Sequence, residues 1–152
     1  MTVGVETCPP GLPITELARL FLDKGIEEIV VLDDGHAAGV IGHTEVLRAY
    51  THPGSRSLTA QDIMREGVPQ VYPEMPLETA AQIMLDQGVQ SLFIIHHASG
   101  VEYPAAYLSF WHYLRLMAAQ TNDDLNDLGI HAQRRSPLEI FIQKRDRARR
   151  RD

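Results

Sequence analysis

The residues of this chain that could carry chemistry begin with seven histidines and one cysteine. His96 and His97 are adjacent, and adjacent residues of a strand point to opposite faces, so they cannot both chelate one ion from a regular strand. No His-x3-His or Cys-His spacing occurs anywhere in the chain. We therefore expect no metal site.

Nucleophilic catalysis has no better support. Cys8 has no histidine near it in the sequence, Ser109 lies in no nucleophile elbow, and there is no Gly-rich phosphate loop. A single cysteine also permits no internal disulfide. We expect a protein that is not an enzyme.

The length and composition fit a globular protein. A chain of 152 residues can bury one sizeable core or two small cores packed together. No apolar run approaches the roughly 18 residues that span a bilayer, and residues 1–5 lack the basic head and apolar stretch of a signal peptide. We expect a cytoplasmic protein with no membrane span.

Charge is divided unevenly along the chain. Residues 1–130 contain 6 Lys and Arg against 17 Asp and Glu, a net charge of −11, whereas residues 131–152 contain 8 against 3, a net charge of +5. An acidic body argues against a nucleic-acid partner that covers the whole surface.

The elements that must position any site are written twice. Residues 10–34, shifted by 63 positions, fall on residues 73–97. The identical pairs are Pro10 and Pro73, Pro13 and Pro76, Ala18 and Ala81, Leu22 and Leu85, Asp23 and Asp86, and Gly25 and Gly88. A repeat of this length is two copies of a small supersecondary unit, so function should be sought where the copies meet.

Each copy predicts the same order of elements. An extended segment (5–8; 68–72) precedes a helix (14–24; 77–87) that ends at a glycine, and a short, wholly apolar and therefore buried strand follows (29–32; 92–95). A turn (33–35; 96–100), a second strand (38–41; 105–108) and a second helix (44–50; 111–120) complete each copy. The second copy has four extra residues near 100–104, and a linker at 51–57 leads to a short capped helix at 59–64.

This duplicated β-α-β-β-α order resembles a tandem pair of cystathionine-β-synthase (CBS) domains, also called a Bateman module. The Asp62-Ile63-Met64 entry, Pro73-x-x-Pro76-Leu77 and the step from Gly88 into a strand carry the resemblance, which covers about residues 3–120. It implies an α/β (α+β) fold of two repeats packed pseudo-twofold, at 1–56 and 57–120, with a helical extension at 121–152. It also implies a cleft between the copies that senses adenosine-containing ligands such as AMP, ATP, S-adenosylmethionine or cyclic dinucleotides.

The resemblance further implies a binding pattern of Gly, two apolar residues, Ser or Thr, two variable residues and Asp. The hydroxyl and the following helix N-terminus suit phosphate, and the Asp accepts hydrogen bonds from both ribose hydroxyls. Copy one has Gly42 at the hydroxyl position, Thr44 where a basic residue is usual, and Glu45 at the ribose position. Glu45 remains a carboxylate able to bind a diol.

Copy two fits the same pattern less well. It keeps the hydroxyl in Ser109, but His112 replaces the Asp and offers only one acceptor when neutral. Trp111 beside it can stack on a base or be a buried or interface residue.

Adenine is expected against the extended segment and the start of the buried strand. Those positions are Thr7, Cys8, Glu27, Glu28 and Ile29 in copy one, and Gln70, Val71, Gln90, Ser91 and Leu92 in copy two. Cys8 aligns with Val71 and is equally a small core residue. Each of the two glutamates would repel a phosphate by about 1 kcal/mol, and Arg48 and Arg115 are the nearest basic residues. A nucleoside, a zwitterion such as S-adenosylmethionine, or no ligand therefore fits better than a triphosphate.

The C-terminal segment predicts a further helix. Ser136-Pro137-Leu138-Glu139 has an N-cap, a proline at the first helical position and an acidic residue near the start. Leu138, Phe141 and Ile142 form an apolar stripe before five arginines. The stripe can dock on the body of this chain or on another protein, and the arginines can meet an acidic surface.

The leading functional hypothesis is a non-enzymatic sensor with no fixed cofactor: an adenosyl ligand binds between the copies and a partner protein of unknown identity reads the change. We expect a homodimer formed through the apolar second helices, with Val46, Leu47, Tyr50, Leu114, Leu116 and Met117 at the contact. The alternative is a ligand-free dimeric scaffold that acts through its C-terminal helix.

Overall fold

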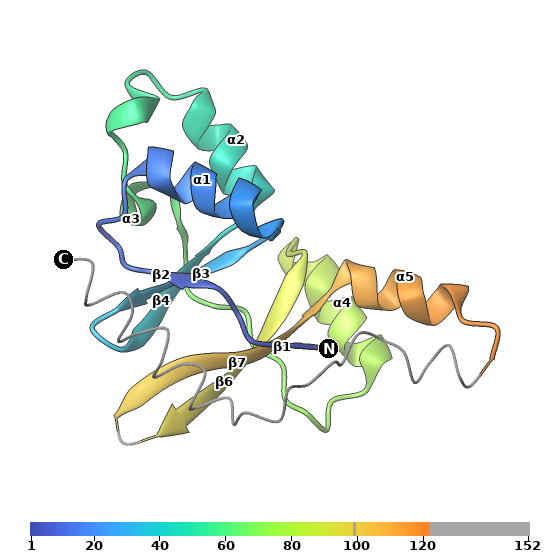
Figure 1. The fold of residues 1–152 in the computed structure, drawn as a ribbon. Helices are drawn as coiled ribbons and strands as arrows, with labels where there is room; N and C mark the ends of the chain where they lie inside the picture. Colours follow the sequence, from blue (N-terminus) through green and yellow to red (C-terminus); the bar gives the residue numbers. More distant parts are fainter. Residues whose placement is uncertain (99, 122–152) are drawn as a thin grey trace. The chain divides into compact units, whose positions relative to one another are not determined.

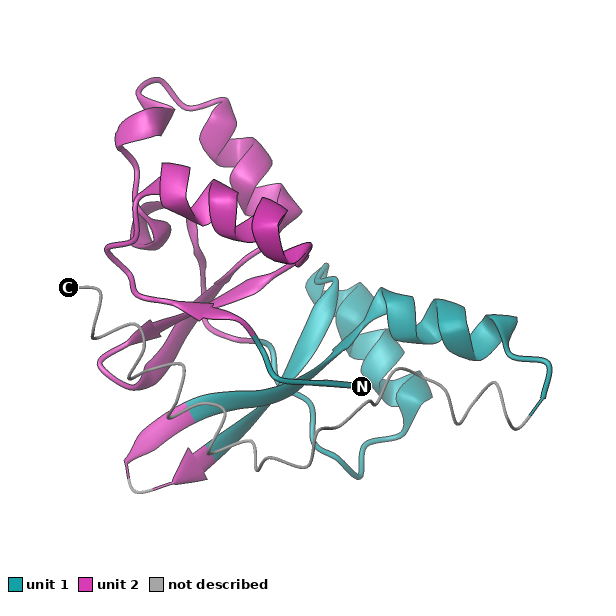
Figure 2. Ribbon diagram, viewed as in Figure 1, with its two compact units in different colours: residues 1–5, 69–96, 103–152 teal, residues 6–68, 97–102 magenta. Residues whose placement is uncertain are grey.

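Residues 1–98 and 100–121 are described by the structure, a computed structural model (Figure 1). They divide into two compact units that exchange segments of chain (Figure 2). The copy-one unit comprises Glu6–Val68 and His97–Glu102, and the copy-two unit comprises Met1–Val5, Pro69–His96 and the chain from Tyr103. The predicted helical extension lies outside the described residues apart from Thr121.

The copy-one unit is built on a four-stranded sheet in the order β2-β3-β4-β5. Its strands are β2 (Thr7–Cys8), β3 (Ile29–Asp33), β4 (His36–Ile41) and β5 (Arg65–Glu66). β2 is parallel to β3, and the other two pairings are antiparallel. Its helices are α1 (Ile14–Lys24), α2 (His43–Tyr50) and α3 (Ala60–Ile63), with the 3-10 turn η1 (Ser55–Ser57) before α3. Leu17 of α1 packs in one core cluster with Ile29, Val31 and Ile41 of the sheet.

The copy-two unit repeats this arrangement. Its sheet has the order β1-β7-β6, from β1 (Thr2–Val3), β7 (Val101–Ser109) and β6 (Ser91–Ala98), and Gln70 forms a parallel bridge to Phe93. Helices α4 (Leu77–Gln87) and α5 (Phe110–Ala118) belong to this unit. Its core contains Ala80 and Met84 of α4 beside Leu92 and Leu108 of the sheet.

Each sheet is completed by a strand from outside its own copy, which the sequence did not predict. β5, from the segment that leads into copy two, pairs with β4 so that Arg65 lies opposite Val40. β1, which leads into copy one, pairs with β7 so that Thr2 lies opposite Tyr107. The repeat offsets of 63 and 67 residues relate the two pairings residue by residue, so the exchange is reciprocal.

The predicted helices of the first position are confirmed to the residue, and both end at glycines with φ of +58° (Gly25) and +62° (Gly88). The predicted turn after β3 contains Asp34 and Gly35 with φ of +47° and +86°, as a two-residue hairpin loop of primed type requires. The short capped helix is also confirmed: the Thr59 backbone N–H and hydroxyl both donate to Asp62 Oδ2, at 2.8 and 2.7 Å.

One predicted turn is wrong. Residues 96–98 belong to β6 rather than to a loop, and β7 begins at Val101. The four extra residues of copy two therefore lengthen both arms of the hairpin, because histidine and alanine continue the strand pairing as readily as apolar residues do. The second helix of copy two also ends earlier than predicted, at Ala118. Among the described residues, no helix is long and apolar enough to cross a membrane.

Candidate functional site

The copy-one half-site is the N-terminus of α2, where β4 ends. Gly42 is the N-cap residue, and its backbone N–H donates a 2.9 Å hydrogen bond to Oε2 of Glu45. The Glu45 side chain is only 5% exposed, so this bond holds a buried carboxylate against the start of its own helix. The predicted ribose-binding residue is therefore fixed in one orientation by local backbone geometry.

A second carboxylate flanks the same glycine. A Cβ atom built on Gly42 would lie 3.2 Å from both Cγ and Oε1 of Glu28, and 3.4 Å from Oε2 of Glu45. The serine or threonine that the family pattern has here would require Glu28 to move. Gly42 is thus the residue that lets two glutamates approach one helix N-terminus.

The other predicted residues of copy one divide into two groups. Cys8 and Ile29 are buried in the core cluster, so only their backbone could touch a ligand. Burial raises the pKa of the Cys8 thiol to about 12, so the thiol stays protonated and is a poor nucleophile. Thr7 and Glu27 are half-buried, and Thr44 is exposed.

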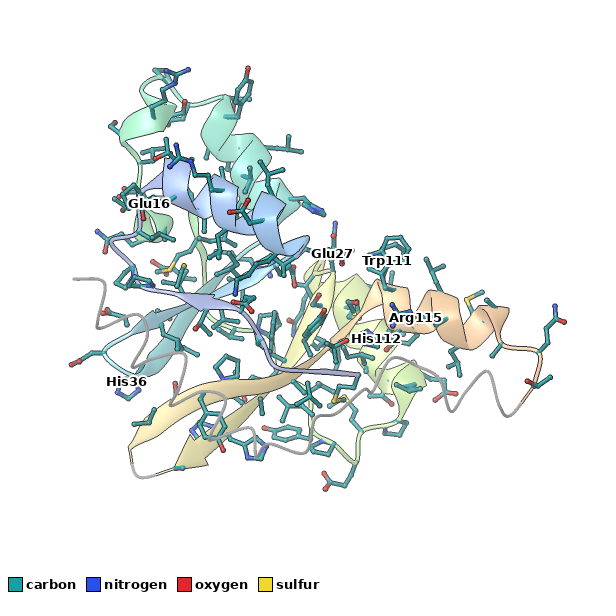
Figure 3. All side chains as sticks on the ribbon, in the orientation of Figure 1. Glu16, Glu27, His36, Trp111, His112 and Arg115 are labelled. Atoms are coloured by element: carbon teal, nitrogen blue, oxygen red, sulfur yellow. The ribbon has the colours of Figure 1, made fainter. Side chains whose placement is uncertain are left out.

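The copy-two half-site uses the same local geometry with different chemistry. The Ser109 backbone N–H donates to His112 Nδ1 at 2.9 Å, and Ser109 Oγ lies 3.1 Å from the same nitrogen. Because Nδ1 accepts, the ring proton is assigned to Nε2, which donates to Thr2 Oγ1 at 3.0 Å. His112 thereby clips strand β1 onto this unit (Figure 3).

His112 is held in its neutral form. Its side chain is 8% exposed, and the edge of the Tyr107 ring lies 5.7 Å from it. Burial, and secondarily the positive Met1 amine, lowers the pKa of His112 to about 4. Both ring nitrogens and the Ser109 hydroxyl are thus engaged inside the protein, and this half-site has little capacity left to bind a ribose.

The remaining predicted residues of copy two offer few polar side chains. Val71 and Leu92 belong to the core, and Ser91 is 2% exposed. Gln70 and Gln90 are exposed, and Gln90 uses its backbone oxygen to accept the Phe110 N–H. Trp111 is 46% exposed and its ring centroid lies 4.9 Å from that of Phe110.

Sequence reasoning missed two residues, Thr2 and Arg65, which belong to the exchanged strands. The offset of 63 residues places Arg65 on Thr2, and the offset of 67 places Glu45 on His112. Since Thr2 contacts His112, Arg65 occupies the equivalent position beside Glu45. The numerical offset was available in the sequence, but the strand with which each segment pairs was not.

Acidic and imidazole groups also meet at the hairpin tip of the copy-one unit. His36 Nδ1 and His97 Nδ1 lie 3.8 and 3.4 Å from the carboxylate of Glu102, and His36 is labelled in Figure 3. Within residues 1–98 and 100–121, however, no group of three or more His, Cys, Asp or Glu side chains is arranged to hold a metal ion.

Comparison with known structures agrees with this geometry. A CBS-domain containing protein from Agrobacterium tumefaciens is 20% identical, with 72% of this chain and 81% of that chain covered and a TM-score of 0.63. The CBS domain pair of protein MJ0100, in complex with 5′-methylthioadenosine and S-adenosyl-L-methionine, is 16% identical, with coverage of 77% and 90% and a TM-score of 0.67. A hexameric CBS-CP12 protein from bloom-forming cyanobacteria is 18% identical, with coverage of 75% and 63% and a TM-score of 0.64. At these identities the likeness concerns the fold.

Sequence comparison identifies the family. A search of curated protein sequences gave no match. The family model of the CBS domain matches twice, over residues 1–52 and 60–102, which confirms the predicted duplication and its α/β fold. This protein therefore belongs to the CBS domain family and contains a tandem pair of CBS domains.

Proposed function

We propose that this CBS pair is a non-catalytic regulatory module that binds one adenosine-containing ligand, such as AMP, ADP or S-adenosylmethionine, at the copy-one half-site. The observation that carries the proposal is the buried Glu45 carboxylate, oriented by the Gly42 N–H at 2.9 Å. A carboxylate has about four lone-pair sites on two oxygens, so one backbone bond leaves acceptors for two ribose hydroxyls.

The two half-sites support a stoichiometry of one ligand per chain. In copy two, the groups equivalent to Gly42 and Glu45 are Ser109 and His112, and they are bonded to each other and to Thr2. A ligand there would have to displace the Thr2 contact. The MJ0100 pair was solved with two adenosine derivatives, 5′-methylthioadenosine and S-adenosyl-L-methionine, and supports that ligand class for this fold.

Signalling would follow from differential affinity. A ligand changes the population of two conformations only by as much as its affinities for them differ. In this proposal the ligand favours one conformation of the module, and a partner protein distinguishes that conformation from the other.

Isothermal titration calorimetry and thermal unfolding of the full chain test the proposal. AMP, ADP, ATP and S-adenosylmethionine are titrated into the wild-type protein and into Glu45→Gln. Glutamine can still accept the Gly42 N–H through its amide oxygen, but it lacks the charge and the second acceptor that bind a diol. A ligand at about 100 times its dissociation constant adds roughly 2.7 kcal/mol, which raises Tm by at least about 5 °C.

The matched control is Glu66→Gln, which removes one charge from an exposed position on the same sheet. We expect saturable binding of one ligand per chain in the wild type and in this control, and loss of binding in Glu45→Gln. Binding that survives in Glu45→Gln, or two equivalents per chain, would contradict the proposed site.

The second candidate function is a dimeric scaffold, and exposed apolar side chains on the second helices favour it. Leu47 and Tyr50 of α2 are 67% and 81% exposed, and Met117 of α5 is 81% exposed. Val46, which the sequence placed at the dimer contact, instead packs against the core of its own unit. A homodimer through these helices is compatible with either function, so ligand binding decides between them.

A further inference from the structure

The copy-one half-site contains a cation that the sequence did not predict there. Arg65 lies in β5, and its Nη2 atom is buried without a hydrogen-bond partner among the described residues. Buried polar atoms in native proteins are almost always paired, so such an atom calls for an explanation. An acceptor supplied by a bound ligand is one explanation that can be tested.

The sheet register places Arg65 on the side of the sheet that faces away from the helices. Ile29, Val31 and Ile41 point into the core under α1, so the alternating residues Val30 and Val40 point to the opposite face. Directly paired residues share a face, which puts Arg65 with Val40 and Thr7 with Val30. Arg65 therefore shares a face with Thr7, a residue already expected to contact adenine.

The second copy shows where a side chain at this position reaches. Thr2 is the equivalent of Arg65, and its Oγ1 lies 3.0 Å from Nε2 of His112, the equivalent of Glu45. The N-cap bond that orients each partner is 2.9 Å long in both copies. The longer arginine side chain consequently starts beside Glu45 and extends past it.

The charges near Gly42 define what such an arginine can recognise. Glu28 and Glu45 both flank the glycine, so the half-site without Arg65 carries two carboxylates. A guanidinium presents five N–H donors in a planar fork that matches a carboxylate or a phosphate. One arginine offsets one added anionic group, whereas a polyphosphate would face two carboxylates with a single compensating cation.

We propose that Arg65 is the residue of the copy-one half-site that recognises an anionic group of the ligand, and that it selects an adenosine derivative with one phosphate or carboxylate over the uncharged nucleoside. The inference rests on the proposed function, since it names the ligand class of the same site. Glu45 contacts the ribose, and the Arg65 guanidinium pairs with the anion.

Two ligand pairs that differ in the anionic group test this inference. AMP is compared with adenosine, and S-adenosylmethionine with 5′-methylthioadenosine, by calorimetry on the full chain. The variants are Arg65→Met, which keeps the aliphatic stem, and Arg65→Lys, which keeps the charge without the fork. The control is Arg56→Met, which removes an exposed positive charge from the linker of the same unit.

In the wild type and in Arg56→Met we expect the charged member of at least one pair to bind at least tenfold more tightly than the uncharged member. Arg65→Met should reduce that ratio to about one without changing the affinity for the uncharged nucleoside, and Arg65→Lys should give an intermediate ratio. The pair that shows the effect identifies the anion as phosphate or carboxylate.

Two results would overturn the inference while leaving the proposed function intact. One is a wild-type protein that binds adenosine and AMP, and both members of the other pair, equally well. The other is an Arg65→Met variant that loses affinity for charged and uncharged members by the same factor, as a structural role would produce. Failure of all four compounds to bind the wild type would instead overturn the proposed function and this inference with it.

Discussion

Acidification should weaken the folded protein through His112. The pKa of this imidazole falls from 6.5 in the unfolded chain to about 4 in the fold, because its burial and the bond from the Ser109 N–H favour the neutral ring. A lowered pKa means that the unfolded chain binds the proton more tightly, so the stabilisation is complete above pH 6.5 and is lost as pH falls toward 4.

The magnitude follows from these two pKa values. Between pH 7.5 and pH 5 the unfolded chain gains most of a proton at this site and the folded protein gains almost none, which removes about 2 kcal/mol of stability. For a chain of this size that is a decrease in Tm of about 4 to 8 °C. The affected contact is the one that holds Thr2, so strand β1 should be the first element to detach.

Urea unfolding at a series of pH values measures the effect, with His112→Gln as the informative variant. Glutamine removes the titration, so its stability should vary less between pH 7.5 and pH 5 by about 2 kcal/mol. Carboxylates and exposed histidines titrate in both proteins, and their contribution cancels in the comparison. His52→Gln, at an exposed linker position, should behave as the wild type does. Identical pH dependence in the wild type and His112→Gln would refute the reasoning.

Three further changes test other features. Thr2→Val leaves the buried Nε2–H of His112 without its acceptor and should cost about 1 to 2 kcal/mol in urea unfolding at pH 7.5, and no loss would show that the contact contributes nothing. Gly42→Ser restores the side chain usual in the family, but it must displace Glu28 from 3.2 Å, so we expect a loss of about 1 kcal/mol in the same assay; an unchanged midpoint would mean that Glu28 moves freely. Leu47→Glu places a charge on the exposed face of α2 and should shift the proposed homodimer to monomer in sedimentation velocity, whereas an unchanged mass would exclude that face from the contact.

The duplication made most of the fold predictable from sequence. Helices α1 and α4 were each supported by two independent copies of the same pattern, and Gly25 and Gly88 marked their ends because only glycine adopts a left-handed conformation without strain. The wholly apolar runs that became β3 and β6 could only be buried strands.

The parts that escaped prediction depend on contacts between distant segments. β1 and β5 have two residues each, too few for any periodic pattern, and their partners lie far along the chain. The same limit hid Arg65, whose relation to Glu45 depends on the pairing of β5 with β4. It also hid the closure of copy two, since the bond between His112 and Thr2 spans 110 residues.

The reciprocal exchange of β1 and β5 has a consequence for how this protein can be inherited and dissected. A gene fragment that ended before Arg65 would encode copy one without its outer strand, and one that began after Val5 would encode copy two with β7 as a bare sheet edge. Exposed edges invite pairing between molecules and aggregation. Neither half is thus a self-sufficient building block, and duplication, recombination or expression should succeed only when both copies are passed on together.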